Sequence, residues 1–219
     1  LMGAALSLYG SALTETTIVR AVLLFYLTPG WSIALECLFL GRRWSLQNTL
    51  SIMAALCGIV LIFRGNVSFG GWGAGDTIAF LSGITWACGS ALTYTAPRAA
   101  VRSLALMACI CGLFAGALTA LWLGQSPEAV ARMPGALIPA ALLGIVYFAP
   151  VVVLTLWCAR LLPPGIMSFL LTGEILSGVL SSALLLDDPF GWPEVVGASL
   201  VTIGALGEVF FPKRAAGST

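Results

Sequence analysis

IVRAVLLFYLTPGWSIALECLFL, residues Ile18 to Leu40, is the most informative stretch of the chain. It is long enough to cross a membrane as a helix, which takes about 20 mostly apolar residues. It also contains Arg20, Glu36 and, near its middle, Pro29. A charged side chain at membrane depth faces a bundle interior or a wet cavity, and a proline there leaves carbonyls that protein or water must satisfy. We therefore predict a helix that breaks at Pro29 and lines a transport path.

The composition is that of a protein with several membrane-spanning helices. Of the 219 residues, 59% are hydrophobic and 9% are charged, whereas soluble domains have about 25% charged residues. Apolar runs cover nearly the whole length, so we predict a single membrane domain, residues 1–219, whose partner is the lipid bilayer. The formal net charge is +1 and the chain has no basic block, which argues against nucleic acid as a partner.

The residue types needed for metal or cofactor chemistry are scarce, and we expect neither a metal nor a cofactor. The six cysteines lie inside apolar runs without CxxC spacing, and the chain has no histidine to complete a zinc site. An intramembrane enzyme would need a nucleophile with a base, paired aspartates or a metal cluster at membrane depth. Every aspartate falls in a predicted loop, so an enzyme is the less favoured alternative.

The apolar runs predict one partial span followed by about seven complete ones. The expected ranges are 1–13, 18–40, 49–63, 77–96, 103–123, 136–158, 164–186 and 192–211. The loops on one side of the predicted membrane hold Arg42, Arg43, Arg98, Arg102, Arg160, Lys213 and Arg214, and those on the other hold Arg64, Arg132, Asp76, Glu128, Asp187, Asp188 and Glu194. The positive-inside rule makes the first side cytoplasmic, so we expect a cytoplasmic C-terminus.

The chain carries a weak internal repeat. A shift of 146 positions overlays Leu40 on Leu186 and Gly58 on Gly204. The loop alternation puts corresponding turns on opposite sides of the membrane, so the two copies are predicted to be inverted. Inverted repeats underlie alternating access in many secondary transporters, with the binding site at mid-membrane between the halves. The same shift places Glu174 opposite Thr28, beside the predicted break.

Three segments together resemble the drug/metabolite transporter superfamily, EamA type: FYLTPGWSIALECLFLGRRWS (25–45), GDTIAFLSGITWACGSALT (75–93) and LLTGEILSGVLSSALLLDDPFGWPEVVGASLVTIGAL (170–206). The resemblance covers essentially the whole chain. It implies an all-α membrane helix bundle of ten helices in two inverted halves, of which about eight would be present here. Residues 1–63 would then be the remainder of the first repeat, truncated by two helices, and residues 76–211 the second. The usual Gly-Glu turn after the fourth helix is replaced by Gly41-Arg42.

Glu174 is the leading candidate for substrate binding. It lies about 10 residues into its predicted span, roughly 15 Å deep, where a carboxylate could bind a cation or a proton, or bond to a neighbouring helix. Arg20 could hold a substrate carboxylate, pair with Glu174, or extend to the outer surface. Glu36 could take part in an inner gate or pair with Arg42 or Arg43.

Tyr26, Trp31 and Trp86 could form an aromatic wall for cationic or amphipathic molecules, or serve only in packing. The sequence thus leads us to expect a secondary active transporter in the plasma membrane, the inner membrane of a bacterium. Its predicted activity is export of small organic metabolites, amino acid or drug-like, by alternating access, with protons as the hypothesised coupling ion. The alternatives are an intramembrane enzyme and a non-transporting structural membrane protein.

Overall fold

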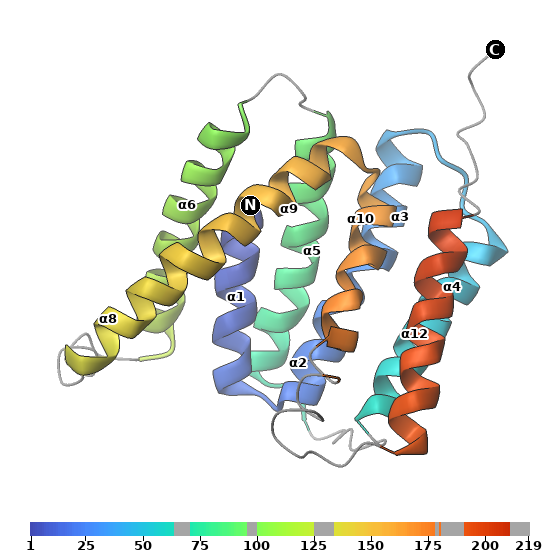
Figure 1. The fold of residues 1–219 in the computed structure, drawn as a ribbon, viewed down its shortest axis with the longest axis horizontal. Coiled ribbons are helices and arrows are strands. Elements are labelled where there is room, and N and C mark those ends of the chain that lie inside the picture. Colours follow the sequence, from blue (N-terminus) through green and yellow to red (C-terminus); the bar gives the residue numbers. More distant parts are fainter. Residues whose placement is uncertain (64–70, 96–99, 125–133, 178–179, 181–190, 211–219) are drawn as a thin grey trace.

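The computed structural model describes residues 1–63, 71–95, 100–124, 134–177, 180 and 191–210. In this part all regular structure is helical, which confirms the predicted all-α class (Figure 1). The helices are α1 (Met2–Glu15), α2 (Ile18–Phe25), α3 (Thr28–Phe39), α4 (Leu46–Ile62), α5 (Ala74–Thr95), α6 (Val101–Trp122), α8 (Pro134–Leu143), the π-helix η1 (Gly144–Phe148), α9 (Ala149–Leu161), α10 (Pro164–Leu171) and α12 (Trp192–Phe210).

Three helical stretches are long and apolar enough to cross a membrane: Ile18–Phe39, Val101–Trp122 and Gly144–Leu161. The sequence predicts about seven spans, and Leu46–Ile62, Pro164–Ser177 and Trp192–Gly207 are apolar but shorter helices. Large apolar side chains on α6 point outward, among them Leu106, Ile110, Leu113, Phe114 and Leu118. Soluble monomers rarely expose an apolar patch of this kind, so the outer surface is suited to lipid.

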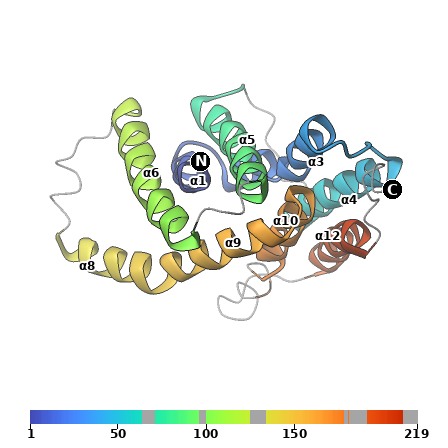
Figure 2. The same ribbon diagram turned by 90° about the horizontal axis from the view of Figure 1, so that it is seen from above.

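The helices stand side by side in two groups that α5 joins (Figures 1 and 2). On one side α1 packs between α5 and α6, with α9 against α5 and α6. On the other side α10 packs against α3 and α12, and α12 packs against α4. Because α5 also contacts α2 and α3, it connects the two groups through the centre of the bundle.

Helices α4 and α12 pack against each other in antiparallel orientation through glycines. A Cβ added to Gly58 would lie 2.5 Å from the carbonyl oxygen of Gly197, and one added to Gly197 would lie 2.5 Å from that of Gly58. Near the start of α4, the amide of Gln47 donates to the carbonyl oxygen of Gly207 at 2.6 Å. Small residues let two helix backbones approach this closely without a side chain between them.

The helix that contains Pro29 is broken directly before the proline. Helix α2 ends at Phe25 and α3 begins at Thr28, with Pro29 in its first turn. A proline is tolerated in a first turn, because its missing N–H would have no partner within the helix there. The hydroxyl of Thr28 donates back to the carbonyl oxygen of Phe25 and so satisfies an acceptor at the break.

A second break interrupts the helix that contains Glu174. Helix α10 ends at Leu171, Thr172 forms a turn, and residues 173–177 are helical again. The hydroxyl of Thr172 donates to the carbonyl oxygen of Phe169, as Thr28 does to Phe25. The bundle therefore contains two discontinuous helices that use the same threonine contact.

The predicted span 136–158 consists of three pieces in the structure. Helix α8 leads into the π-helix η1, and α9 follows with Pro150 in its first turn. Pro150 has no N–H to donate to the preceding turn, and a π-helical turn is a common way to absorb such a defect. The predictions for Arg64, Arg98, Glu128, Arg132, Asp187, Asp188, Lys213 and Arg214 concern residues outside the described ranges.

Candidate functional site

A cavity of about 390 Å³ lies between α1, α5, η1, α9 and the broken helix that begins with α10. This volume is within the range of small-molecule sites, about 300–1,000 Å³. Its lining residues are Met2, Gly3, Leu6, Trp86, Tyr147, Phe148, Val151, Val152, Thr155, Leu156, Leu170, Leu171 and Glu174. Among these, Glu174 is the one carboxylate, and neither lysine nor arginine occurs. The described lining thus combines apolar walls with a single acidic group.

Glu174 lies two residues after the break at Thr172, on the wall of the cavity. The hydroxyl of Tyr26 lies 3.5 Å from its Oε2 and 3.4 Å from the carbonyl oxygen of Leu171, so these two acceptors share its single hydrogen. Both distances are long for an O–H···O bond, which is usually 2.5–3.0 Å. A carboxylate has about four acceptor positions, so this contact leaves Glu174 able to bind a ligand.

The two helix breaks meet at this point. Tyr26 directly follows Phe25, the last residue of α2, and Leu171 is the last residue of α10. Their contact through the Tyr26 hydroxyl joins the two discontinuities beside the cavity. Helix ends have unpaired backbone groups, so this region is polar although the surrounding side chains are apolar.

Trp86 on α5 is 3% exposed and forms part of the cavity wall. Its ring packs edge-on against Phe25, with centroids 6.3 Å apart. Phe25 in turn packs edge-on against Tyr26 at 5.3 Å and lies 4.5 Å from the ring of Tyr9. These contacts fix the orientation of the Trp86 indole next to the α2 break.

Trp31 is not among the described lining residues of this cavity and neither is Tyr26, so Trp86 is the member of the predicted aromatic wall that borders it. The ring of Trp31 packs edge-on against Phe80 at 5.5 Å, and Trp31 lines another pocket together with Trp44. Five residues separate Tyr26 from Trp31, which is a rotation of about 140° around a helix even before the break is considered. The two side chains consequently face different parts of the bundle.

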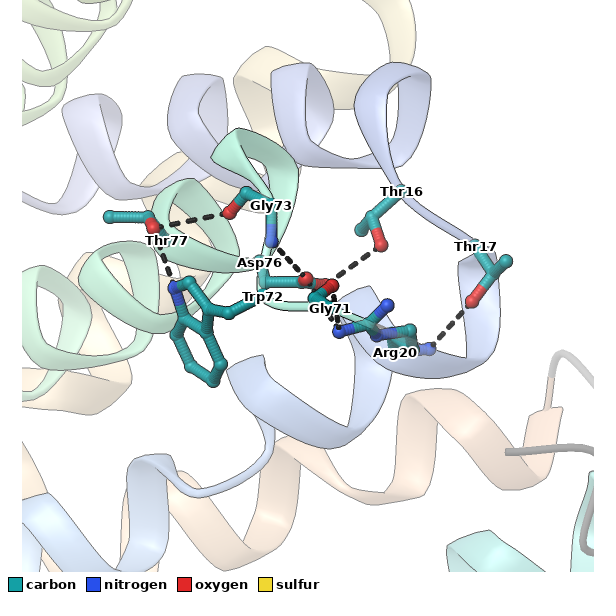
Figure 3. Close-up of polar contacts among 8 residues, drawn as sticks. All are labelled: Thr16, Thr17, Arg20, Gly71, Trp72, Gly73, Asp76 and Thr77. Atoms are coloured by element: carbon teal, nitrogen blue, oxygen red, sulfur yellow. Dashed lines mark hydrogen bonds and ion pairs between the residues drawn. The ribbon is translucent and has the colours of Figure 1, made fainter. Parts of the chain in front are cut away.

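Arg20 forms an ion pair with Asp76 at 2.6 Å rather than with Glu174 (Figure 3). Asp76 also accepts hydrogen bonds from the hydroxyl of Thr16 and the backbone N–H of Gly73, each at 2.8 Å. Arg20 further donates to the carbonyl oxygen of Gly71 at 3.3 Å. Asp76 lies in the first turn of α5, where the helix dipole favours an acid. This cluster ties the α1–α2 turn to the start of α5 and stands apart from the cavity lining.

Glu36 is buried between α3 and α10. Its carboxylate pairs with Arg42 at 2.6 Å and accepts a hydrogen bond from the backbone N–H of Gly165 at 2.5 Å. Gly165 lies in the first turn of α10, so Glu36 satisfies an N–H that has no partner within that helix. One turn earlier on α3, the hydroxyls of Ser32 and Ser168 share a hydrogen bond of 2.6 Å. Glu36 thus holds the two helices together at some distance from the cavity.

Of the residues singled out in the sequence, Glu174, Tyr26 and Trp86 come together, while Arg20, Glu36 and Trp31 lie elsewhere. Sequence reasoning missed Thr155 and Tyr147, which contribute polar groups to the lining. Both are polar residues within an apolar run, a signal that points to the bundle interior but does not identify a partner. Within the described residues, no three side chains of metal-ligating types lie close enough to hold a metal ion.

Asp76→Asn is expected to lower the free energy of unfolding by about 1–3 kcal/mol, because it removes the counter-charge of Arg20 from a buried hydrogen-bonded cluster. The measurement is thermal unfolding of the purified protein in detergent. Glu15→Gln is the control, since Glu15 is an exposed acid at the end of α1. Equal unfolding temperatures for Asp76→Asn and Glu15→Gln would show that the cluster does not stabilise the fold.

Comparison with known proteins supports the fold. Neither a protein-family model nor a curated protein matches the chain. A solved structure described as "Crystal structure of protein" superposes with a TM-score of 0.65 over 92% of this chain and 72% of its own, at 16% sequence identity. At that identity the likeness concerns the fold alone.

Proposed function

We propose that this chain belongs to a secondary active transporter that exports small organic molecules by alternating access. The observation that carries the proposal is the meeting of two broken helices beside a cavity whose described lining has one carboxylate. In secondary transporters, substrate sites are typically formed by discontinuous helices, whose free backbone groups and helix ends coordinate the substrate. The resemblance of three segments to EamA-type transporters points to the same function.

The helix boundaries support a repeat of 146 residues. Adding 146 to the bounds of α2, 18–25, gives 164–171, which are the bounds of α10. Helix α4 begins at residue 46 and α12 at residue 192, and α1 ends at residue 15 and α9 at residue 161. The corresponding helices α4 and α12 run antiparallel, as inversion across a membrane requires. We therefore propose that residues 1–63 and 76–211 are inverted repeats.

The placement of arginines supports the proposed orientation. The turn after α3, the last turn of α9 and the start of α6 lie at one end of the bundle (Figure 1). These positions hold Arg42, Arg43, Arg102 and Arg160. By the positive-inside rule that end faces the cytoplasm. The proposed location is the plasma membrane, with a cytoplasmic C-terminus.

In this proposal Glu174 holds either a cationic substrate or a proton. The described lining has one carboxylate, which can pair with one positive charge at a time. Substrate and proton would then compete for the same group, which is how an exchanger couples their movements. Tyr26 sits at the junction of the breaks, where a change in either helix would alter its contact with Glu174.

Replacement of Glu174 tests this function. The chain is reconstituted in liposomes with an imposed pH gradient, and movement of the cation 6-acetyl-1-methylquinolinium is followed. Glu174→Gln is expected to reduce pH-driven movement at least about tenfold, since the loss of a charge-assisted contact amounts to about 1.5–3 kcal/mol. Glu15→Gln removes an exposed acid elsewhere and should transport like the wild type. Unchanged pH-driven transport by Glu174→Gln would refute the coupling role.

A further inference from the structure

A buried carboxylate joins α3 to α10 near the proposed cytoplasmic end of the bundle. Glu36 on α3 is 3% exposed, pairs with Arg42 at 2.6 Å and accepts the backbone N–H of Gly165 at 2.5 Å. A Cβ added to Gly165 would lie 3.1 Å from the Oε1 of Glu36, so the two helices fit closely here. One turn earlier on α3, the buried hydroxyls of Ser32 and Ser168 share a hydrogen bond of 2.6 Å. These five residues are called the latch below.

The latch lies between the two helix breaks and the cytoplasmic end. Helix α3 runs from the first break at Thr28 toward that end, and α10 runs back from it to the second break at Thr172. The two helices stand side by side (Figure 1). Gly165 is near the start of α10, whereas Leu171 at its end lines the cavity. Separation of α3 from α10 on the cytoplasmic side, with the breaks as hinges, therefore requires the latch to open.

The latch also joins the two proposed repeats, because α3 belongs to residues 1–63 and α10 to residues 76–211. In transporters built from inverted repeats, one half moves against the other around the binding site. Contacts between the halves at one end then hold in one state and separate in the other. The position of the latch is that of such a contact.

Opening of the latch leaves the charge of Glu36 paired. Arg42 is on the same repeat as Glu36, and its backbone N–H donates to the Glu36 carbonyl oxygen at 3.2 Å, so the two residues move together. The bonds that separate are those from Glu36 to Gly165 and from Ser32 to Ser168. An ion pair divided between the two helices would instead leave a charge without its partner, which is costly in a buried site. The latch is therefore suited to repeated opening and closing.

The residue types of the latch do not recur in the second repeat. In the sequence, Ser182 stands 146 positions after Glu36, and Asp188 stands 146 positions after Arg42. Serine and aspartate cannot reproduce a carboxylate paired with a guanidinium. The latch thus favours closure at the cytoplasmic end over closure at the opposite end.

We propose that the latch is the cytoplasmic gate of the transporter and that Glu36 is its gating residue. The gate is closed in this structure. It opens when Gly165 and Ser168 move away from α3 while Glu36 retains Arg42. This inference rests on the proposed function and assigns to it the contact that controls access from the cytoplasm.

The first experiment measures the opening of the latch by cysteine labelling. Ser168→Cys is made in the full chain with its six native cysteines replaced by alanine, and a water-soluble maleimide is added to the purified protein in detergent. Ser168 is 1% exposed, so labelling requires opening. Glu36→Gln is expected to speed this labelling about tenfold, since it replaces a charge-assisted bond to Gly165 by a neutral one. Ser51→Cys is the matched control, because Ser51 is also buried but lies at the contact of α4 with α12, and Glu36→Gln should leave its labelling unchanged.

The second experiment locks the latch. The pair Ser32→Cys, Ser168→Cys in the same cysteine-free chain is expected to form a disulfide on oxidation. The oxidised protein in liposomes should carry 6-acetyl-1-methylquinolinium at least about tenfold more slowly than the reduced protein, because a gate that cannot open blocks turnover. A reducing agent should restore transport, and each single cysteine variant should transport equally under both conditions.

The outcomes separate this inference from the proposed function. Equal acceleration of labelling at positions 168 and 51 would show that Glu36 only stabilises the fold, and the gate would be refuted. Undiminished transport by the disulfide-linked protein would refute it as well. If the reduced protein and the wild type carry no cation while Glu36→Gln speeds labelling at position 168 alone, the proposed function fails and the opening of the latch is confirmed. Unchanged labelling at position 168 together with normal transport would overturn only the role of Glu36.

Discussion

Glu36→Ala is expected to lower the free energy of unfolding by about 3–5 kcal/mol, the cost of removing one partner from a buried ion pair. The carboxylate is 3% exposed, pairs with Arg42 and accepts the N–H of Gly165. Its removal takes a counter-charge from Arg42 and leaves the Gly165 N–H buried without this acceptor. The measurement is the thermal unfolding of the purified protein in detergent, with aggregation followed by size-exclusion chromatography.

Three companion variants identify the cause. Ser32→Ala removes only the neutral bond to Ser168 in the same helix interface, which should cost about 0.6 kcal/mol, as is typical within membranes. Glu36→Gln keeps an acceptor for Gly165 and should fall between Ser32→Ala and Glu36→Ala. The double variant Glu36→Ala, Arg42→Ala should recover part of the loss, because no charge is left behind. A Glu36→Ala protein as stable as Ser32→Ala would show that the ion pair contributes nothing.

Gly58→Ala is expected to destabilise the protein by about 1–3 kcal/mol, the usual cost of overpacking, and Gly58→Leu to prevent native packing of α4 on α12. A Cβ at this position would meet the carbonyl oxygen of Gly197 at 2.5 Å and the backbone N of Val201 at 2.9 Å. Backbone atoms cannot move aside as the end of a flexible side chain can, so the two helices would have to separate. Thermal unfolding in detergent measures the loss.

Gly10→Ala is the matched control for this prediction. Gly10 lies within α1, is exposed, and has no atom within 4 Å of the position of an added Cβ. Alanine there should be neutral or stabilise the helix by about 0.5–1 kcal/mol. Gly197→Ala should behave like Gly58→Ala, since the contact is reciprocal. Similar stabilities for the Gly58 and Gly10 variants would contradict the close packing of α4 on α12.

The two helix breaks differ in how far the sequence could predict them. Pro29 predicts the first, because a proline lacks the N–H that would continue the helix. The second, at Thr172, has no proline nearby, and the residue 146 positions after Pro29 is Ile175. Thr172 and Gly173 are poor helix formers, but they weaken a helix without ending it. The packing around Thr172, which is 1% exposed, and its bond to the carbonyl oxygen of Phe169 stabilise the turn.

The sequence predicted which types of residue form the candidate site, but not which of the candidate residues come together there. A carboxylate within an apolar run is expected to face a cavity or another helix, which pointed to Glu174; in the structure Glu174 lines the cavity and its side chain is accessible. The same argument applied equally to Arg20 and Glu36, yet Asp76 and Gly165 bind them at positions 56 and 129 residues away along the chain. Nothing in the local sequence ranks such distant partners. Trp31 and Trp86 likewise cannot be told apart from the sequence, since both are tryptophans near the middle of an apolar run. In the structure they lie on different helices and line different pockets.

The sequence by itself determined that this chain is helical, that its surface is apolar enough for helices to cross a membrane, and that one helix breaks before Pro29. These properties depend on composition and on the backbone chemistry of neighbouring residues. Both can be read from the sequence without knowledge of tertiary contacts. The tertiary structure decided which charged side chains form ion pairs and which carboxylate borders a cavity. Those outcomes depend on which helix faces meet, and this is a property of the whole bundle.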